Sequence, residues 1–207
     1  NTFDGNIVNK EGGNAGYQLR CGGAGVLESA LGTGATYITV TSPANTLTLN
    51  TWQHVAVTYD GINARLFKNG VQVAITAGTL PIVTSPNALR IGDYAVTPGA
   101  RTFGGKIDEV RIWNTAVSAV DLLTYKDLER CGNEANLLAY YRFNQGVEDA
   151  NNAGVTTLND QTAFLNNGTL ANFTLNGTTS NWVLGKTGMT PCVTCNAAPA
   201  AGTISGS

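Results

Sequence analysis

The sequence predicts an all-β protein, a sandwich of two antiparallel sheets with one short helix near residues 118–130. The first observation is composition, because the 207 residues include 27 Thr, 25 Gly and 22 Asn. Thr favours pleated, half-buried surfaces, whereas Gly and Asn favour tight turns. The second observation is an alternating apolar pattern with turn signals between residues 52 and 76. The third is a scarcity of stretches rich in Ala, Leu, Glu and Lys, which helices prefer.

Short runs of strand-forming residues alternate with turn residues along the chain. In the first half, strands are predicted at 17–21, 25–31, 37–41, 52–59, 64–68 and 71–75. Asn69-Gly70 joins the last two of these and suits a type I′ turn, since both central positions of that turn need a positive φ. In the second half, strands are predicted at 89–92, 105–113, 137–143, 156–158, 168–170 and 182–184.

One helix is predicted after the strand at 105–113. Ser118 is placed as its N-cap and Asp121 in its first turn, which is a variant of the capping box. Leu122, Leu123, Tyr125 and Leu128 supply an apolar stripe, and Cys131-Gly132 is predicted to end the helix.

Charge and hydropathy exclude two classes of partner. Only 13% of the residues are charged and the net charge is −2, so the chain lacks the basic excess that neutralises a phosphate backbone. Nucleic acid is therefore excluded as an expected partner. No apolar run approaches ~18 residues, so no membrane insertion is expected.

The cysteines indicate an oxidising compartment. The four cysteines are Cys21, Cys131, Cys192 and Cys195, an even number in a charge-poor chain. We favour pairing Cys21 with Cys131 and Cys192 with Cys195, although Cys21 and Cys131 as buried thiols stay an alternative. With His54 the only histidine, the residues argue against a zinc site.

Residues 50–61, 67–70 and 103–114 form three motifs that follow one another along the chain. In this order they resemble the laminin G-like jelly-roll modules of the concanavalin A-like lectin and glucanase superfamily. Residues 138–146, Asp160 and residues 166–170 are similar to a further signature that such modules carry in secreted Bacteroidetes-type bacterial proteins. The resemblance covers about residues 7–184 and implies a jelly-roll, concanavalin A-like fold.

The resemblance also implies a domain organisation. Residues 1–184 are predicted to form one laminin G-like domain that lacks the family's first strands, and residues 185–207 a linker with the possible start of a following β-domain. Residues 136–184 either complete this domain or begin a second repeat. We expect completion, because a half-repeat would leave its apolar face uncovered. The chain begins at Asn1 without an initiator Met, which we interpret as a mature piece or a fragment.

Three functions are compatible with the resemblance. We favour a non-catalytic module that binds carbohydrate or glycoprotein as part of a large secreted or cell-surface bacterial protein. The alternatives are a structural or adhesive spacer repeat in a surface adhesin and, as the weakest, a glucanase. Retaining glucanases need two carboxyls about 5–5.5 Å apart, which next-but-one positions on a strand provide. Here Asp108 and Glu109 are adjacent, so their side chains should point to opposite faces. We therefore expect no enzyme activity.

Calcium is the expected cofactor. The resemblance places Asp93 where pentraxin-type relatives carry calcium ligands, and Asp160 with Asn166 where the family has an Asp-rich loop. Asp108 completes the set of candidate ligands. Calcium prefers such carboxylate and amide oxygens. The alternative is that these residues form side-chain turns.

Sugar recognition requires an aromatic platform with polar groups beside it. Tyr94, Arg90 and Arg101 are the candidates, because they flank the loop that follows Ile91. The expected partners are glycans or glycoproteins and other domains of the same polypeptide.

Overall fold

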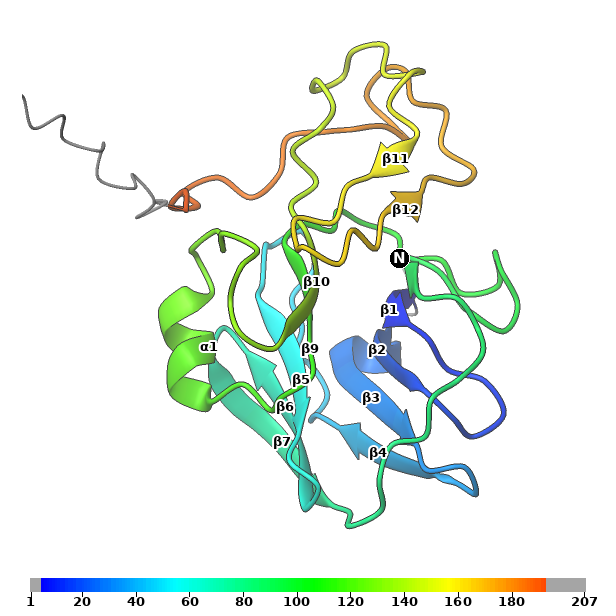
Figure 1. The fold of residues 1–207 in the computed structure, drawn as a ribbon, viewed down its shortest axis with the longest axis vertical. Helices are drawn as coiled ribbons and strands as arrows, with labels where there is room; N and C mark the ends of the chain where they lie inside the picture. Colours follow the sequence, from blue (N-terminus) through cyan, green and yellow to red (C-terminus); the bar gives the residue numbers. More distant parts are fainter. Residues whose placement is uncertain (1–4, 193–207) are drawn as a thin grey trace, which may run out of the picture.

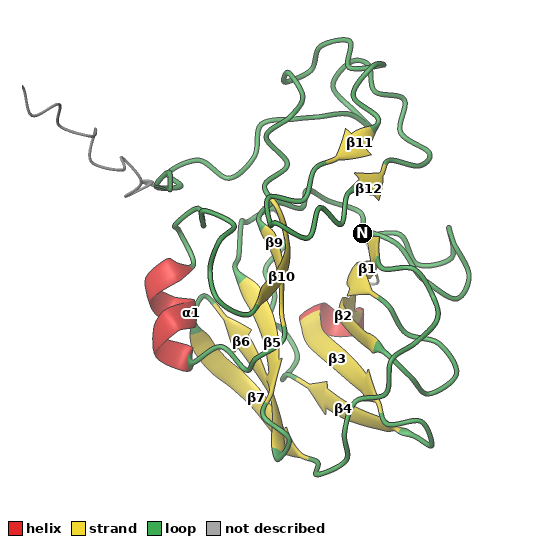
Figure 2. Ribbon diagram, in the orientation of Figure 1, coloured by secondary structure: helices red, strands yellow, loops and turns green. Residues whose placement is uncertain are grey.

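A computed structural model describes residues 5–192 of the chain. Two layers of antiparallel strands face each other, and one short helix lies at the outer side of one layer (Figure 1; Figure 2). The predicted fold class, an all-β two-sheet sandwich with one short helix, is confirmed. The longest helix of the described part has seven residues, and none there could cross a membrane.

The first layer has five strands in the order β4-β3-β2-β1-β8. Its strands are β1 (Gly5–Asn9), β2 (Tyr17–Gly22), β3 (Val26–Gly32), β4 (Tyr37–Thr41) and β8 (Arg90–Ile91). A 3-10 turn, Gly23–Gly25, joins β2 to β3. The sequence patterns missed β1, because Asn6 and Asn9 are fully buried there rather than solvent-facing. The Asn9 amide donates to the side chains of Asn6 (3.1 Å) and Gln18 (3.3 Å).

The second layer contains the meander β5 (Val55–Tyr59), β6 (Asn63–Lys68) and β7 (Val71–Ala77), with the ribbon β9 (Val110–Trp113) and β10 (Leu137–Tyr141) beside it (Figure 1). Asn69 and Gly70 have φ values of 51° and 81°, so the predicted β6–β7 hairpin turn is confirmed. The predicted strand at 105–113 is too long. Glu109 has a φ of 57°, a left-handed conformation that cannot continue a strand, so β9 begins at Val110.

The helix α1 (Ala119–Tyr125) begins as predicted and ends earlier. The Ser118 hydroxyl accepts a hydrogen bond from the Asp121 amide at 3.1 Å. The helix stops at Tyr125 instead of Cys131-Gly132, because Leu128 leaves the helical path and pairs with Thr190 in a parallel bridge. The Arg111 guanidinium also donates to the Tyr125 and Leu128 carbonyls, at 3.1 and 2.5 Å.

Two hydrophobic clusters form the core. The first lies between the layers and includes Leu27, Val40 and Leu66. The second joins Val8 of β1 to residues of the upper part of Figure 1, where the short strands β11 (Thr157–Leu158) and β12 (Gly168–Thr169) pair. Trp182 belongs to this second cluster but not to a strand, so the strand predicted at 182–184 is wrong.

The disulfide joins Cys131 to Cys192, which makes the predicted pairings Cys21–Cys131 and Cys192–Cys195 wrong. The reason is that the segment before Cys192 is not a free linker. The Thr190 amide donates to the Asp127 carbonyl at 2.9 Å, and the Glu129 amide donates to the Thr190 carbonyl at 2.8 Å. These bonds lay the two segments side by side. Cys195 and the predicted start of a following domain lie outside the described residues.

Candidate functional site

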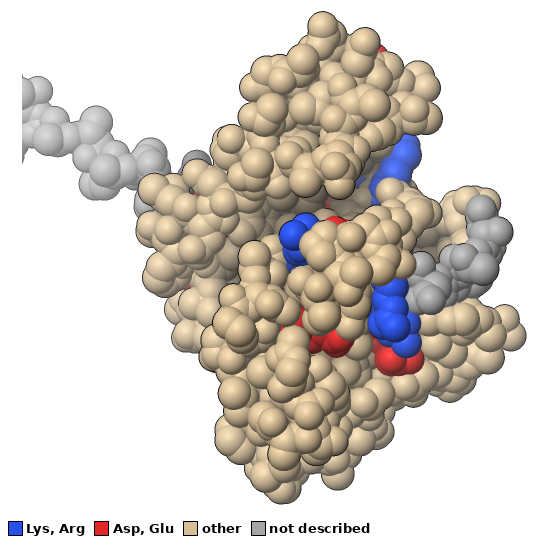
Figure 3. Space-filling model, turned by 90° about the vertical axis from the view of Figure 1, so that its right-hand side faces the viewer, with Lys and Arg blue, Asp and Glu red and all other residues tan. Residues whose placement is uncertain are grey.

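Two of the three predicted ligand residues, Tyr94 and Arg101, contact each other in the loop that follows β8, whereas Arg90 lies in β8 and contacts Asp93 instead. The Arg101 guanidinium carbon lies 4.9 Å from the Tyr94 ring centroid, and Arg90 pairs with Asp93 at 3.3 Å. Burial and the neighbouring Glu11 carboxylate raise the pKa of Tyr94. Figure 3 views the molecule from this side and shows a mostly uncharged face on which the few basic and acidic side chains lie near one another. The loop therefore presents a stacked Arg101–Tyr94 pair, and the Asp93 carboxylate in the same loop is paired with Arg90.

The four predicted calcium ligands do not form one coordination shell. Asp93 accepts a hydrogen bond from the Gly99 amide at 2.9 Å, whereas Asp108 accepts one from the Lys186 amide at 2.9 Å. Only Asp160 and Asn166 are neighbours, and there the Asn166 amide donates to the Asp160 carboxylate. In the described part of the chain, no cluster of three or more His, Cys, Asp or Glu could hold a metal ion. The predicted ligands therefore do not fit a shared calcium site.

The carboxylates of Asp108 and Glu109 both accept hydrogen bonds from groups within the fold. The Glu109 carboxylate accepts hydrogen bonds from the Tyr140 hydroxyl and from Arg111, each at 2.6 Å, and the Asp108 carboxylate accepts one from the Lys186 amide. Burial raises the pKa of both acids, and for Glu109 these two hydrogen bonds work against that rise. Glu109 and Arg111 thus pair their charges, with the carboxylate oxygen 2.6 Å from the guanidinium nitrogen.

An open pocket of about 280 Å³ with a mixed polar and apolar lining, which the sequence did not reveal, lies where β9 ends and β10 begins. One wall is the segment at 132–138, which is the loop before β10 with the first two residues of that strand, and the other wall is the loop at 162–164. Its lining residues are Asn114, Gly132, Asn133, Glu134, Asn136, Leu137, Leu138, Thr162, Ala163 and Phe164.

The Asp160 carboxylate organises the second wall. One oxygen accepts hydrogen bonds from the amides of Tyr140 and Thr162, at 2.9 and 3.0 Å, and the other accepts them from the Thr162 hydroxyl (2.8 Å) and the Asn166 amide (2.9 Å). Burial alone would raise the pKa of Asp160, but these hydrogen bonds outweigh it and lower the pKa. The loop they fix carries the Phe164 side chain, which is 62% exposed. The Asp160–Asn166 spacing that suggested calcium is thus explained by a side-chain turn.

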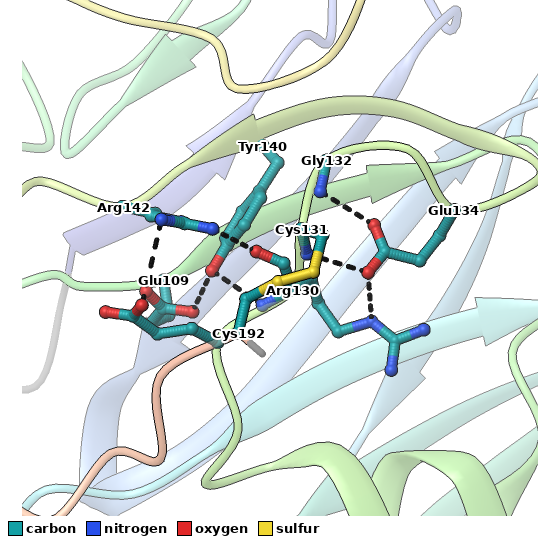
Figure 4. The surroundings of a disulfide bond; sticks show 9 residues. Glu109, Arg130, Cys131, Gly132, Glu134, Tyr140, Arg142 and Cys192 are labelled. Atoms are coloured by element: carbon teal, nitrogen blue, oxygen red, sulfur yellow. Dashed lines mark hydrogen bonds and ion pairs between the residues drawn. A yellow bond between two sulfur atoms is a disulfide. The ribbon is translucent and has the colours of Figure 1, made fainter. Parts of the chain in front are cut away.

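Glu134 organises the first wall in the same way. Its carboxylate accepts hydrogen bonds from the amides of Cys131 and Gly132, both at 2.9 Å, and pairs with Arg130 at 3.1 Å (Figure 4). Gly132 has a φ of 89°, and a Cβ at this position would lie 2.2 Å from the Gln161 carbonyl oxygen. Glycine is therefore required for the two walls to meet.

The disulfide and a buried charged network anchor this wall to the sheet. The Arg130 amide donates to the Tyr140 hydroxyl at 3.0 Å, and that hydroxyl donates to Glu109 (Figure 4). The guanidinium carbons of Arg111 and Arg142 lie 5.3 and 5.5 Å from the Tyr140 ring centroid. Burial, together with Glu109, raises the pKa of Tyr140 to about 12, so the hydroxyl stays protonated and donates.

The three asparagine side chains on the pocket rim are available for a ligand. Asn114, Asn133 and Asn136 are exposed, and their side-chain amides make no hydrogen bond within the described structure. Each amide can donate two hydrogen bonds and accept two. In the sequence, the one visible signal was Phe164-Leu165, an apolar pair inside an otherwise polar loop. The spare amides could not be recognised, because the sequence does not tell which asparagines are bonded internally.

Comparisons with known proteins agree on the fold. The family model for the concanavalin A-like lectin/glucanases superfamily matches residues 1–122, more than half of the chain. A solved structure of a "putative carbohydrate binding protein" from Bacteroides ovatus is similar with a TM-score of 0.61 and 27% identity. That match covers 82% of this chain and 48% of the other, so the chain spans about half the length of this neighbour.

A second solved structure is more distant. It is an S-layer domain-containing protein from Clostridium thermocellum, with 24% identity and a TM-score of 0.31 over 60% of this chain and 64% of the other. A search of curated proteins gave no significant match.

Proposed function

The chain belongs to the concanavalin A-like lectin/glucanase superfamily, and from this premise we propose that it is a non-catalytic carbohydrate-binding module of a secreted or cell-surface protein. We place the glycan in the pocket between the segment at 132–138 and the loop at 162–164. The Bacteroides ovatus neighbour, named as carbohydrate binding, supports the general function. The geometry of the pocket supports the location.

The observation that carries the location is an exposed aromatic ring beside unbonded amides. The Phe164 side chain is 62% exposed, and Asn114 and Asn133 line the same pocket with side-chain donors and acceptors that no described residue uses. Ligand sites combine an apolar or aromatic surface with a few fixed polar groups in this way. A sugar presents the complementary surfaces, because its C–H groups are apolar and its hydroxyls both donate and accept.

The carboxylates support binding rather than hydrolysis. Asp108 and Glu109 are neighbours in the chain, and each accepts hydrogen bonds that hold the fold together. Glycoside hydrolysis requires two carboxyls that flank the bond to be cleaved. Neither acid is among the residues that line the pocket.

The test is a panel of immobilised polysaccharides and glycoprotein glycans, probed with the labelled protein, with hydrolysis of the same polymers measured in parallel. We expect binding to at least one glycan and no release of reducing sugar. Reducing sugar released from a β-glucan by the parent protein, and not by Asp108→Ala, would instead identify a glucanase.

A spacer repeat is the second candidate, because the match covers only 48% of the Bacteroides ovatus neighbour, the share expected of one unit among several. Absence of binding across the whole panel would favour this candidate over a glycan-binding module.

Calcium stays a proposal with a separate test. A melting temperature that rises with millimolar calcium and falls with a chelator would support a bound ion. An unchanged melting temperature would remove it.

A further inference from the structure

We propose that the pocket selects one uncharged sugar ring, at a chain end or a branch, and discriminates against acidic sugars. The ring would stack on Phe164, and its hydroxyls would bond to the amides of Asn114 and Asn133. This inference rests on the proposed function and names the class of glycan that the site takes.

The charges that line the pocket favour a neutral ligand. Glu134 is the one ionisable residue of the lining, and no Lys, Arg or His is among the described residues that form it. The Arg130 guanidinium beside Glu134 is already paired with that carboxylate at 3.1 Å. An acidic sugar would therefore lose hydration without gaining a counter-ion.

The size of the pocket favours a single ring. Its volume of about 280 Å³ lies just below the range for drug-sized small-molecule sites, roughly 300–1,000 Å³. A chain end or branch can place one ring in such a space and leave the rest of the glycan outside. The interior of a linear polymer would need a longer groove.

The walls are rigid enough to hold this geometry before the ligand arrives. Asp160 fixes the Phe164 loop through four hydrogen bonds, and Glu134 with the Cys131–Cys192 disulfide fixes the facing loop. A pre-ordered site loses less conformational entropy on binding.

The chain offers matched controls for the two kinds of contact. Phe164→Ala is compared with Phe173→Ala, because Phe173 is also exposed (52%) but lies outside the pocket. Asn133→Ala is compared with Asn176→Ala, an exposed asparagine elsewhere. Asn136 is not used, because its φ of 70° would strain an alanine. All four variants change exposed side chains and should melt near the parent temperature.

Affinity electrophoresis provides the readout, with neutral glucan, mannan, galactan and xylan as probes. Polygalacturonate, fully methyl-esterified or de-esterified, adds one polymer in a neutral and an acidic form. We expect binding to a neutral probe that changes little between low and high salt. Phe164→Ala should weaken it about tenfold and Asn133→Ala roughly three- to tenfold, with both controls unchanged.

Three results would contradict the inference in distinguishable ways. Neutral binding that survives Phe164→Ala and Asn133→Ala would remove the pocket as the site. Salt-sensitive binding to acidic polymers alone, lost in Arg101→Ala, would keep the module's function but move it to the Arg101–Tyr94 loop. No binding to any probe or panel glycan would overturn the proposed function, and the inference with it.

Discussion

Removing the Cys131–Cys192 disulfide should be among the most costly single changes to this fold. The bond joins two cysteines with a sequence separation of 61, and the loop that it closes contains both pocket walls. In the chain-entropy account, cross-links that close about 15 and about 100 residues stabilise by about 3 and 4.7 kcal/mol. A separation of 61 falls between them, which gives about 4 kcal/mol as an upper value.

Part of this value is expected to be lost in practice, since measured disulfides contribute about 2–4 kcal/mol. For a domain of this size, 1 kcal/mol shifts the melting temperature by about 2–4 °C. We therefore expect Cys131→Ser/Cys192→Ser to melt about 10 °C below the parent protein. Affinity for the glycan should fall as well, because the segment at 132–138 loses its anchor.

Thermal melts of the parent, the two single variants and the double variant test this reasoning. Each single change removes the same bond, so each should cost as much as the double change, which is the non-additivity expected of a coupled pair. The reasoning would be refuted if the two single changes had additive effects or if the double variant melted within about 2 °C of the parent. A peptide map that links Cys131 to Cys21 would also refute it.

Three further changes test the carboxylate and histidine contacts. Asp160→Asn should lower the free energy of unfolding by about 3 kcal/mol in urea titrations, because the new NH₂ group leaves buried donors unsatisfied; a loss under about 0.5 kcal/mol would contradict the role of Asp160. Burial, with Arg111 nearby, lowers the pKa of His54 to about 4, against about 6.5 in the unfolded chain. Between these two pKa values the unfolded state binds more protons than the folded state, so the free energy of unfolding should fall as the pH drops from about 6.5 to 4. Urea denaturation measured across this pH range should show a weaker pH dependence for His54→Gln than for the parent protein. Tyr140→Phe should cost about 2 kcal/mol in the same urea assay, because Glu109 and the Arg130 amide both lose the hydroxyl; an unchanged midpoint would show that the network contributes nothing.

Local signals predicted those parts of the fold that depend on neighbouring residues alone. Asn69-Gly70 specifies its turn because both positions tolerate a positive φ. Ser118 caps its helix because its hydroxyl oxygen accepts a hydrogen bond from the backbone amide of Asp121, three residues later. Neither feature needs information from a distant part of the chain. Both were therefore visible in the sequence.

Features that depend on distant segments were missed or misplaced. β1 carries fully buried asparagines, which hide its pattern because a buried polar residue looks like a turn residue in a sequence. Cys192 meets Cys131 because Thr190 pairs with the segment at 127–129, a contact that no spacing rule reveals. The pocket likewise depends on Gly132 meeting the Gln161 carbonyl from another loop.

The region that contains β11 and β12, in the upper part of Figure 1, shows what many asparagine side chains do in this protein. Its strands β11 and β12 are two residues each, so side chains must satisfy backbone groups that a sheet would otherwise pair. Asn152 does so by bonding the amide and carbonyl of Val147, both at 2.8 Å, and Asn181 by bonding the Ala150 carbonyl at 2.7 Å.

An asparagine-rich composition thus has a structural cause here, and asparagine content alone does not indicate a ligand site. The side-chain amides of Asn114, Asn133 and Asn136 bond nothing in the described structure, as is also true of the exposed Asn176, but these three line one pocket. An exposed amide stays hydrated without any ligand, so folding alone does not explain why three should gather beside Phe164. The proposed recognition of a sugar would account for it, and for that reason we expect the loss of Asn133 to affect binding and to leave stability unchanged.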